Sequence, residues 1–447
     1  MTRIMSVPAA LLALAGCSTP SAKLAASESP GKAAPAPPGH VMRGPLAVGV
    51  SPDAPKDPIG ILLGWGPAET IENFKHLDRF FPVRTVRRGP HVQDLPAGDP
   101  IDPMVTVQVI ADGRLKDTDR KVAIDQLMHD SRITGLIVLH HGRVVLERYA
   151  FGRTAQDRWT SNSIAKSFTS TLVGAAIKDG LIGSLEDPIT RYLPELGPVP
   201  AFDGVTLRHL LIMSSGLKFN EDYYDLTSDV ALYGGGEAIN GRSPIIAYAM
   251  KLVRAHPPGA VEDYQTINTD LVTLALSRVL KPSGRTVSDY LSEKIWRPAG
   301  MEADGNWLLE KTGVERGGCC ISMRLRDFAR FGLFIASGKA DAELPPGWIR
   351  MASTPVWPFG PIQAGYGLGW WVRPDDSYEG QGGLGQSVTI YPKDDLVVAI
   401  NSAGLDPGGI GAPRWWLLKA IDDAVAGRPD HNTGANERSD LDRRASP

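Results

Sequence analysis

The chain has 447 residues, of which 43% are hydrophobic and 22% charged, and its formal net charge is −3 at pH 7. These values are typical of a globular protein large enough for one big core or two modest lobes. The near-neutral charge and the lack of a basic patch with interleaved aromatic residues argue against nucleic acid as a partner. We also expect no cofactor and no metal, because no His or Cys cluster has the spacing of a metal site.

Residues 1–17 have the pattern of a bacterial lipoprotein signal. Arg3 precedes an apolar run of about ten residues, which is too short to span a bilayer but fits the central region of a secretory signal. The run ends in Leu-Ala-Gly-Cys, which resembles a lipobox with Cys17 as the lipidated residue. An uncleaved signal anchor is the alternative. We therefore expect a lipid anchor in the bacterial cell envelope, facing the periplasm, and Ser18 favours the outer membrane.

The segments that flank the folded part are predicted from their composition. Residues 18–56 begin with a stretch rich in Ser, Ala, Lys and Pro, which cannot bury a core and is typical of a flexible tether. Residues 427–447 are charged and are expected to be a disordered tail. The folded domain is expected at residues 57–426. Within it, adjacent cysteines seldom bridge without strain, so we expect Cys319 and Cys320 to be small core residues rather than redox or metal groups.

The first clear elements are a β-hairpin and a helix. Residues 133–149 consist of an apolar strand, a turn at His141-Gly142 and a second strand. From Ser163 onward, apolar residues recur at helical spacing until a stop at Gly180. The hairpin leads directly into this helix, which suggests a sheet packed on it.

Ser163 and Lys166 lie one turn apart at the start of that helix. Free N–H groups and the positive end of the helix dipole favour a developing oxyanion there. A buried lysine that is disfavoured as an ammonium can act as the base that a serine nucleophile needs. The alternative is a serine that caps the helix beside a solvated lysine.

Later elements supply further candidate residues. A short helix in residues 205–217 is capped by Thr206 and ended by Gly216. Tyr264 and Asn268 lie where a loop enters another apolar helix, so their side chains could reach a cleft, although Tyr264 could also be a rim residue. The last predicted elements are a helix at 326–334, strands at 365–372 and 396–400, and a helix at 415–425. Residues 380–385 are too rich in glycine for an ordinary strand, and such glycines mark a close backbone approach or a bulge.

The order of these motifs resembles that of the serine β-lactamase and penicillin-binding superfamily. Within it, the chain is most similar to the branch of the class C-like esterases and the 6-aminohexanoate-dimer hydrolases, over about residues 57 to 425. The resemblance implies an α/β (α+β) fold in which helices and a mostly helical lobe flank an antiparallel sheet. It is carried by five blocks: Ser163-Ile164-Ala165-Lys166-Ser167, residues 207–216, Asn220-Glu221-Asp222-Tyr223, Tyr264 with Asn268-Thr269-Asp270, and Gly383-Leu384-Gly385-Gln386.

The resemblance also implies roles for these residues. Ser163 would be the acylated nucleophile, and Lys166 and Tyr264 would share the proton transfers, with the ammonium lowering the pKa of the phenol. The Ser163 N–H and one from Gly383-Leu384 would form the oxyanion hole. Asn268 would bind substrate, and Asp222 could pair with a substrate amine or simply be solvated.

Two departures from the superfamily pattern narrow the function. The Tyr-x-Asn motif is replaced by Tyr264-Gln265-Thr266-Ile267-Asn268, and the Lys-Thr-Gly strand motif by Gly382-Gly383-Leu384, which lacks the cation that binds a β-lactam carboxylate. We therefore expect a serine hydrolase that cleaves carboxylic esters or small linear amides of the 6-aminohexanoate-oligomer type. The alternatives are a β-lactamase or D-amino-acid peptidase acting on cell-wall material, and a non-catalytic wall sensor. The sequence does not predict an oligomeric state.

Overall fold

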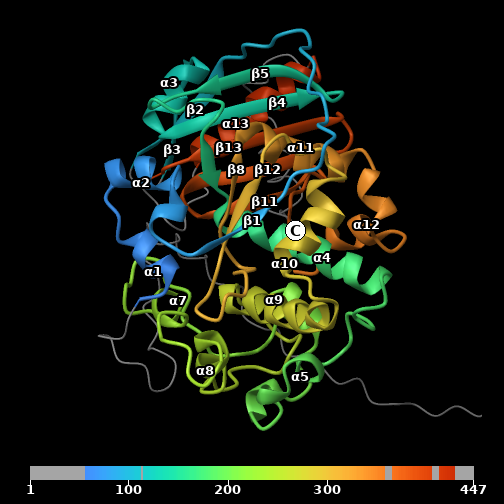
Figure 1. Ribbon diagram of the computed structural model, residues 1–447. Coiled ribbons are helices and arrows are strands. Elements are labelled where there is room, and N and C mark those ends of the chain that lie inside the picture. The colour runs from blue at the N-terminus through green and yellow to red at the C-terminus, as the bar shows by residue number, and fades with distance from the viewer. Residues whose placement is uncertain (1–55, 112–113, 358–364, 405–411, 428–447) are drawn as a thin grey trace, which may run out of the picture. The chain divides into compact units, whose positions relative to one another are not determined.

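The computed structural model describes residues 56–111, 114–357, 365–404 and 412–427 (Figure 1). Every described residue belongs to one compact unit. Apart from their boundary residues, the predicted signal, tether and tail lie outside the described residues. Within the described residues, no helix is both long and apolar enough to cross a membrane.

The largest element is an antiparallel sheet of seven strands in the order β5-β4-β13-β12-β11-β10-β9. Its registers pair Val138 with Val398, and Val388 with Ala399. The strands are β4 (Ile133–His140), β5 (Arg143–Tyr149), β9 (Gly365–Tyr366), β10 (Trp371–Val372), β11 (Tyr378–Gly382), β12 (Gln386–Tyr391) and β13 (Leu396–Ser402).

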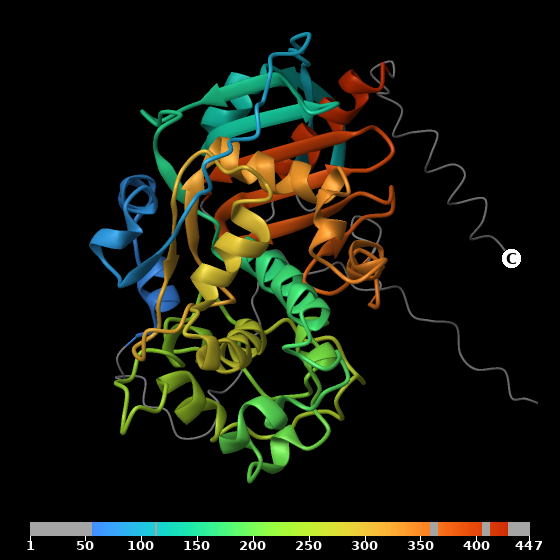
Figure 2. The ribbon, with the colours of Figure 1, turned by 45° about the vertical axis from the view of Figure 1, so that its right-hand side comes forward.

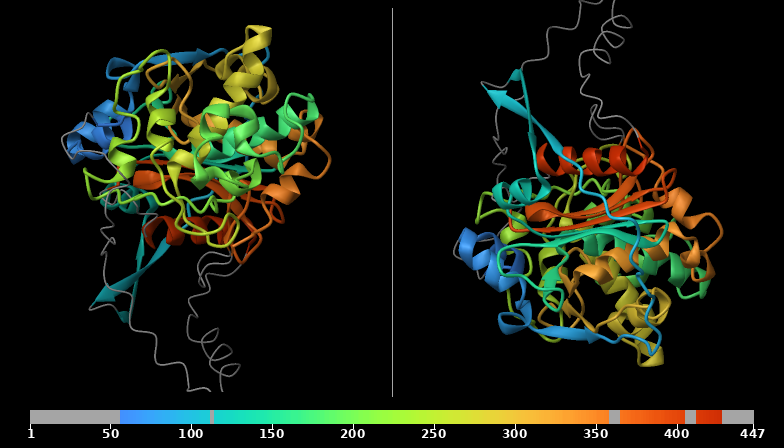
Figure 3. Two further views of the ribbon diagram at one scale, coloured as in Figure 1. Left: turned by 90° about the horizontal axis from the view of Figure 1, so that it is seen from below. Right: turned by 90° about the horizontal axis from the view of Figure 1, so that it is seen from above.

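The central strands of this sheet are buried on both faces. In β4, Ile137 and Leu139 belong to the main core, whereas Leu136 and Val138 belong to a second core on the other face, as the alternation of side chains along a strand requires. Helix α11 (Leu325–Ala336) covers the face of the main core, and α3 (Ile124–Asp130) and α13 (Ala412–Val425) cover the other face (Figure 3). This double burial explains why the strands have continuous apolar runs.

Two smaller sheets accompany the large one. The first has the order β1-β7-β8-β6, and the second pairs β2 with β3. Their bounds are β1 (Val83–Val86), β2 (Val105–Ala111), β3 (Arg114–Val122), β6 (Arg158–Thr160), β7 (Gly305–Leu308) and β8 (Ile321–Arg324).

Helix α4 (Ala165–Lys178) lies between the large sheet and α9 (Thr266–Leu280), and contacts both (Figure 2). Its residues from Ala165 to Ala176 are all buried, so it is a core helix that is covered on all sides. The other helices are α1 (Pro58–Leu63), α2 (Pro67–Phe74), α5 (Ile189–Tyr192), α6 (Leu207–Leu211), α7 (Asp229–Leu232), α8 (Pro244–Ala249), α10 (Val287–Leu291) and α12 (Trp348–Ala352).

Most of the predicted elements are confirmed, among them the hairpin, the Thr206 cap of α6, α9, α11, β13 and α13. Three predictions differ from the structure. Helix α6 ends at Leu211 rather than at Gly216. The strand predicted at 365–372 is split into β9 and β10, because the carbonyls of Leu368 and Gly369 accept hydrogen bonds from α4 hydroxyls. Conversely, part of the glycine-rich stretch is the regular strand β11.

Candidate active site

Ser163 lies in a 3-10 turn (Asn162–Ile164) that directly precedes α4. The sequence predicted that Ser163 lies in the first turn of the α-helix. This prediction is wrong, because α4 begins only at Ala165. The turn begins at Asn162, whose φ of 45° lies in the left-handed region that Asn tolerates better than most residues. The Asn162 side chain accepts a hydrogen bond from Thr160 (3.1 Å) and donates one to the carbonyl of Gly383 (2.8 Å). It therefore ties Ser163 to the end of β11.

The glycines of β11 let this strand approach the Ser163 turn. A Cβ atom on Gly382 would lie 2.4 Å from the Ser161 carbonyl oxygen, and one on Gly380 would lie 2.9 Å from Ser167 Oγ. Both separations are too short for a side chain. The sequence left open what approaches the glycines closely, and in the structure it is the Ser161 backbone for Gly382 and the Ser167 side chain for Gly380.

Lys166 is buried in the first turn of α4, with 2% of its surface exposed. Its ammonium nitrogen lies 3.0 Å from Ser163 Oγ, 3.2 Å from Thr266 Oγ1 and 2.9 Å from the carbonyl oxygen of Gly318. Ser163 is thus within hydrogen-bond reach of a buried amine, which is the arrangement that a serine and its base need.

Burial lowers the pKa of Lys166 to about 8, against the opposing effect of the Glu221 and Asp270 carboxylates. Glu221 contacts the site through Thr266, whose N–H donates to its carboxylate at 3.0 Å and whose hydroxyl also donates to it. The Tyr223 hydroxyl donates to the same carboxylate at 2.6 Å. The lowered pKa favours the neutral form of Lys166, which is able to accept a proton.

Tyr264 lies in the loop immediately before α9 and hydrogen-bonds Ser163. Its ring lies 4.8 Å from the Lys166 nitrogen, stacks on Trp371 and meets Tyr366 edge to face. Burial raises the pKa of Tyr264, the hydrogen bond to Ser163 lowers it, and the nearby carboxylates Glu221 and Glu262 raise it further. The pKa of this phenol is therefore raised overall, whereas the sequence led us to expect a lowering by the Lys166 ammonium.

Of the other predicted site residues, two line a cavity beside Ser163 and two do not. Gly383 and Leu384 form a tight turn after β11, in which Leu384 has a left-handed φ of 64°, and both line a cavity beside Ser163. Asn268 is fully buried in α9, and the hydrogen bond recorded for it is a long one to Met213 Sδ at 3.9 Å. Asp222 is buried and accepts the Tyr224 N–H at 2.8 Å. Neither Asn268 nor Asp222 is among the described residues that line the cavity.

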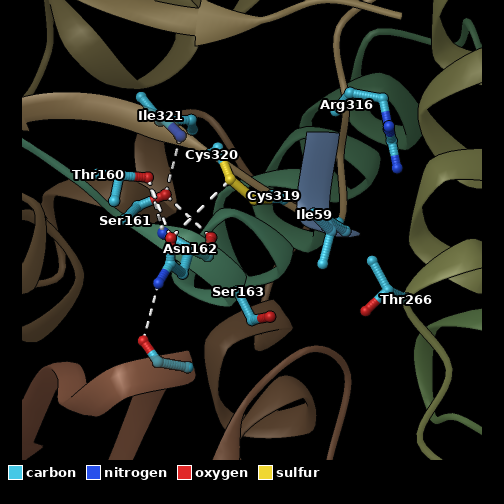
Figure 4. The surroundings of a disulfide bond; sticks show 12 residues. Ile59, Thr160, Ser161, Asn162, Ser163, Thr266, Arg316, Cys319, Cys320 and Ile321 are labelled. Atoms are coloured by element: carbon cyan, nitrogen blue, oxygen red, sulfur yellow. Dashed lines mark hydrogen bonds between the residues drawn. A yellow bond between two sulfur atoms is a disulfide. The ribbon is translucent and has the colours of Figure 1, made fainter. Parts of the chain in front are cut away.

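Cys319 and Cys320 are buried members of the main core, as expected, but the structure also records a disulfide between them. They lie beside the segment Thr160 to Ser163, and Cys319 lines the cavity with Ser163 and Thr266 (Figure 4). The sequence pattern gave no reason to pair them. Cys319 thus forms part of the wall of the candidate site, and Cys320 lies behind it.

A buried charge cluster lies behind Lys166. The Gly318 N–H donates to Asp270 at 2.8 Å, Arg316 donates to the same carboxylate at 2.8 Å, and Arg316 also donates to Asp57 at 2.6 Å. All three charged side chains are at most 1% exposed. The cluster therefore fixes the Gly318 peptide, whose carbonyl holds Lys166.

Sequence reasoning missed two residues of this site, Glu221 and Thr266. Thr266 stands two residues after Tyr264, at the place of Asn in the Tyr-x-Asn motif, so the spacing itself could have identified it in preference to Asn268. Glu221 was part of a quoted block, but Asp222 beside it was preferred as the acidic group. Adjacent side chains in a loop point in different directions, and the sequence contains no signal that separates the two.

Comparisons with known proteins identify the family. The sequence profile of the family described as Beta-lactamase matches residues 121–423. A 6-aminohexanoate-dimer hydrolase from Paenarthrobacter ureafaciens is 26% identical over 357 residues, which cover 75% of this chain and 85% of that protein.

Solved structures show the same fold. A Bacillus anthracis protein provisionally named 6-aminohexanoate-dimer hydrolase superposes with a TM-score of 0.66 at 20% identity, covering 80% of this chain and 95% of that one. A penicillin-binding protein from Bacillus halodurans gives a TM-score of 0.53 at 17% identity, covering 67% and 98%. The α/β fold of the β-lactamase and transpeptidase type is thus confirmed, and the chain belongs to the Beta-lactamase family of hydrolases.

Proposed function

We propose that this protein is a serine hydrolase that cleaves carboxylic esters or small linear amides through an acyl-Ser163 intermediate. The observation that carries the proposal is the 3.0 Å contact between Ser163 Oγ and the buried Lys166 nitrogen, whose pKa is lowered to about 8. A hydroxyl beside a partly neutral amine is equipped to attack a carbonyl carbon.

The proposed reaction has two halves. Ser163 Oγ bonds to the carbonyl carbon while its proton passes to neutral Lys166. The N–H of Ser163 and one from Gly383-Leu384 stabilise the oxyanion. Tyr264, which the raised pKa keeps protonated, donates its proton to the leaving oxygen or nitrogen as the bond to the carbonyl carbon breaks, and Lys166 returns a proton to Tyr264. Water then attacks the acyl-serine ester, and its proton passes through the same groups back to Ser163 Oγ.

Support for esters and linear amides comes from the turn after β11. There, Gly382-Gly383-Leu384 replaces the Lys-Thr-Gly motif, whose lysine supplies the cation that binds a β-lactam carboxylate. A relative of 26% identity is named a 6-aminohexanoate-dimer hydrolase, a linear-amide hydrolase. Hydrolysis of β-lactams or of cell-wall peptides is the second candidate, which the family membership favours.

The test is a side-by-side assay of p-nitrophenyl acetate, p-nitrophenyl butyrate, 6-aminohexanoate dimer and nitrocefin, with wild type and Ser163→Ala. We expect ester or linear-amide hydrolysis by the wild type and a loss of at least about a thousandfold in kcat in Ser163→Ala. Activity that survives in Ser163→Ala would exclude the acyl-serine mechanism. Hydrolysis of nitrocefin alone would favour the second candidate.

We further propose that the enzyme is attached to the cell envelope by a lipid on Cys17, facing the periplasm and most consistent with the outer membrane. The proposal rests on the Leu-Ala-Gly-Cys sequence alone. Globomycin should leave the precursor uncleaved, and labelled palmitate should be incorporated into the wild type but not into Cys17→Ala. Unchanged processing together with no label would exclude the anchor.

A further inference from the structure

The cavity beside Ser163 has apolar walls that come mainly from the N-terminal part of the domain. It comprises about 450 Å³ including its mouth, and Ile59, Leu62 and Leu63 of α1 line it together with Phe74 of α2. Leu384 and Tyr223 complete much of the remaining wall. The described lining residues include no Asp, Glu, Lys, Arg or His.

These walls are held in place by contacts on both sides. Asp57 caps α1 by accepting the Ile59 N–H at 2.8 Å and pairs with buried Arg316 at 2.6 Å. Phe74 is fully buried and packs edge to face on Trp159 of β6, with ring centroids 5.5 Å apart. The cavity is therefore preformed, so that a ligand does not have to order its walls.

The position of Tyr264 indicates which half of a substrate enters this cavity. Tyr264 packs on Tyr366 and Trp371, and none of these three is among the described lining residues. A leaving group departs toward the proton donor, which in the proposed function is Tyr264. Because Tyr264 does not line the cavity, the cavity is left for the acyl half.

We propose that this cavity is the acyl-binding site and that it takes an uncharged, unbranched aliphatic acyl chain. The inference rests on the proposed function and specifies its substrate class. A terminal ammonium or carboxylate on the chain would lose its hydration against the α1 leucines without gaining a partner of opposite charge. The carboxylate nearest to the cavity, Glu221, already accepts hydrogen bonds from Thr266 and Tyr223. The preferred acyl group is thus hexanoyl-like rather than 6-aminohexanoyl-like.

The experiment measures kcat/KM for p-nitrophenyl acetate, butyrate, hexanoate, octanoate and 6-aminohexanoate. Wild type should prefer butyrate or hexanoate to acetate, and hexanoate to 6-aminohexanoate by at least about tenfold. Leu63→Trp should fill the cavity and lower kcat/KM about tenfold more for hexanoate than for acetate. Leu63→Ala should shift the optimum toward octanoate.

The matched control is Ile61→Trp, on the same helix but 40% exposed and outside the cavity. It should keep the chain-length profile of the wild type. The inference is overturned if Leu63→Trp and Ile61→Trp have the same profile, or if the 6-aminohexanoyl ester is the better substrate, while activity still depends on Ser163. Activity that persists in Ser163→Ala would instead overturn the proposed function.

Discussion

The pKa values of Lys166 and Tyr264 are shifted in opposite directions. Burial lowers the pKa of Lys166 to about 8, while burial and two nearby carboxylates raise that of Tyr264. When the pH is near its pKa, a lysine accepts a proton readily. When the pH is far below its pKa, a phenol can only donate one. The structure therefore favours Lys166 as the base and Tyr264 as the acid, a division that the motif by itself left open.

Glu221 raises the pKa of Lys166 and so opposes the lowering by burial. Its carboxylate stabilises the ammonium form, so Glu221→Gln should lower the pKa of Lys166 further. In the wild type, kcat/KM for an ester should rise with pH through about 8 as Lys166 loses its proton. In Glu221→Gln the same rise should occur at lower pH, by about one unit. A pH profile of kcat/KM with p-nitrophenyl butyrate measures both.

The control for this shift is Glu310→Gln. Glu310 is also a buried carboxylate, but it accepts hydrogen bonds from Thr312 and the Val314 N–H and contributes nothing to the pKa of Lys166. Glu310→Gln should lower the free energy of unfolding without shifting the pH profile of kcat/KM. An unshifted profile in Glu221→Gln, or an equal shift in Glu310→Gln, would contradict the assigned role.

At the scale of elements, strand β11 and the turn that carries Ser163 depend on each other. The strand can pair with β12 and still approach this turn only because Gly382, against Ser161, and Gly380, against Ser167, have no side chains. The glycines that weaken a strand in isolation are tolerated because tertiary contacts on both sides hold it.

Gly382→Ala should disrupt the contact between β11 and the turn that carries Ser163. The new Cβ would lie 2.4 Å from the Ser161 carbonyl, so the strand or the turn has to shift, at a cost of about 1–3 kcal/mol in the free energy of unfolding. Because Gly383 would move with it, kcat/KM should fall by about a hundredfold. Urea denaturation and ester hydrolysis measure the two effects.

Gly236→Ala is the control, because its new Cβ would lie at an ordinary contact distance of 3.6 Å from the nearest atom, Pro244 Cβ. It should change neither quantity appreciably. Wild-type kcat/KM in Gly382→Ala would show that the close approach is irrelevant to catalysis.

At the scale of the whole molecule, the Arg316 cluster joins segments far apart in the sequence. Arg316 pairs with Asp57, 259 residues away, and with Asp270, 46 residues away. Through Gly318 the cluster supports Lys166, and through Asp57 it supports the α1 wall of the cavity. One buried network thus holds both the proposed base and the proposed acyl site.

Asp57→Asn should destabilise the fold strongly, because Arg316 would keep a buried charge with one of its two carboxylates gone. The expected loss is about 3 kcal/mol in the free energy of unfolding by urea. The exposed pair of Lys393 with Asp376 provides the contrast, and Asp376→Asn should leave the free energy of unfolding almost unchanged. Equal losses in the two variants would contradict the importance of the buried network.

Local patterns in the sequence were sufficient for most of the fold and for the core of the site. The three-residue spacing of Ser163 and Lys166 predicts that they meet, and it is confirmed by the 3.0 Å contact. The apolar run of β13 and the Thr206 cap of α6 are likewise signals that depend only on neighbouring residues. The family's block order added Tyr264, which lies beside both.

Only the tertiary structure decided the rest. Thr266 is 100 residues from Lys166 along the chain, and Glu221 is 45 residues from Thr266, so no local periodicity links them. The aromatic segment around Phe74 had no predicted role, yet with α1 it walls the cavity. Periodicity reports which face of an element is buried, whereas the partner that covers that face depends on how distant elements pack. For this protein, the sequence therefore determined the chemistry of the proposed nucleophile, and the packing determined its proton environment and what it can bind.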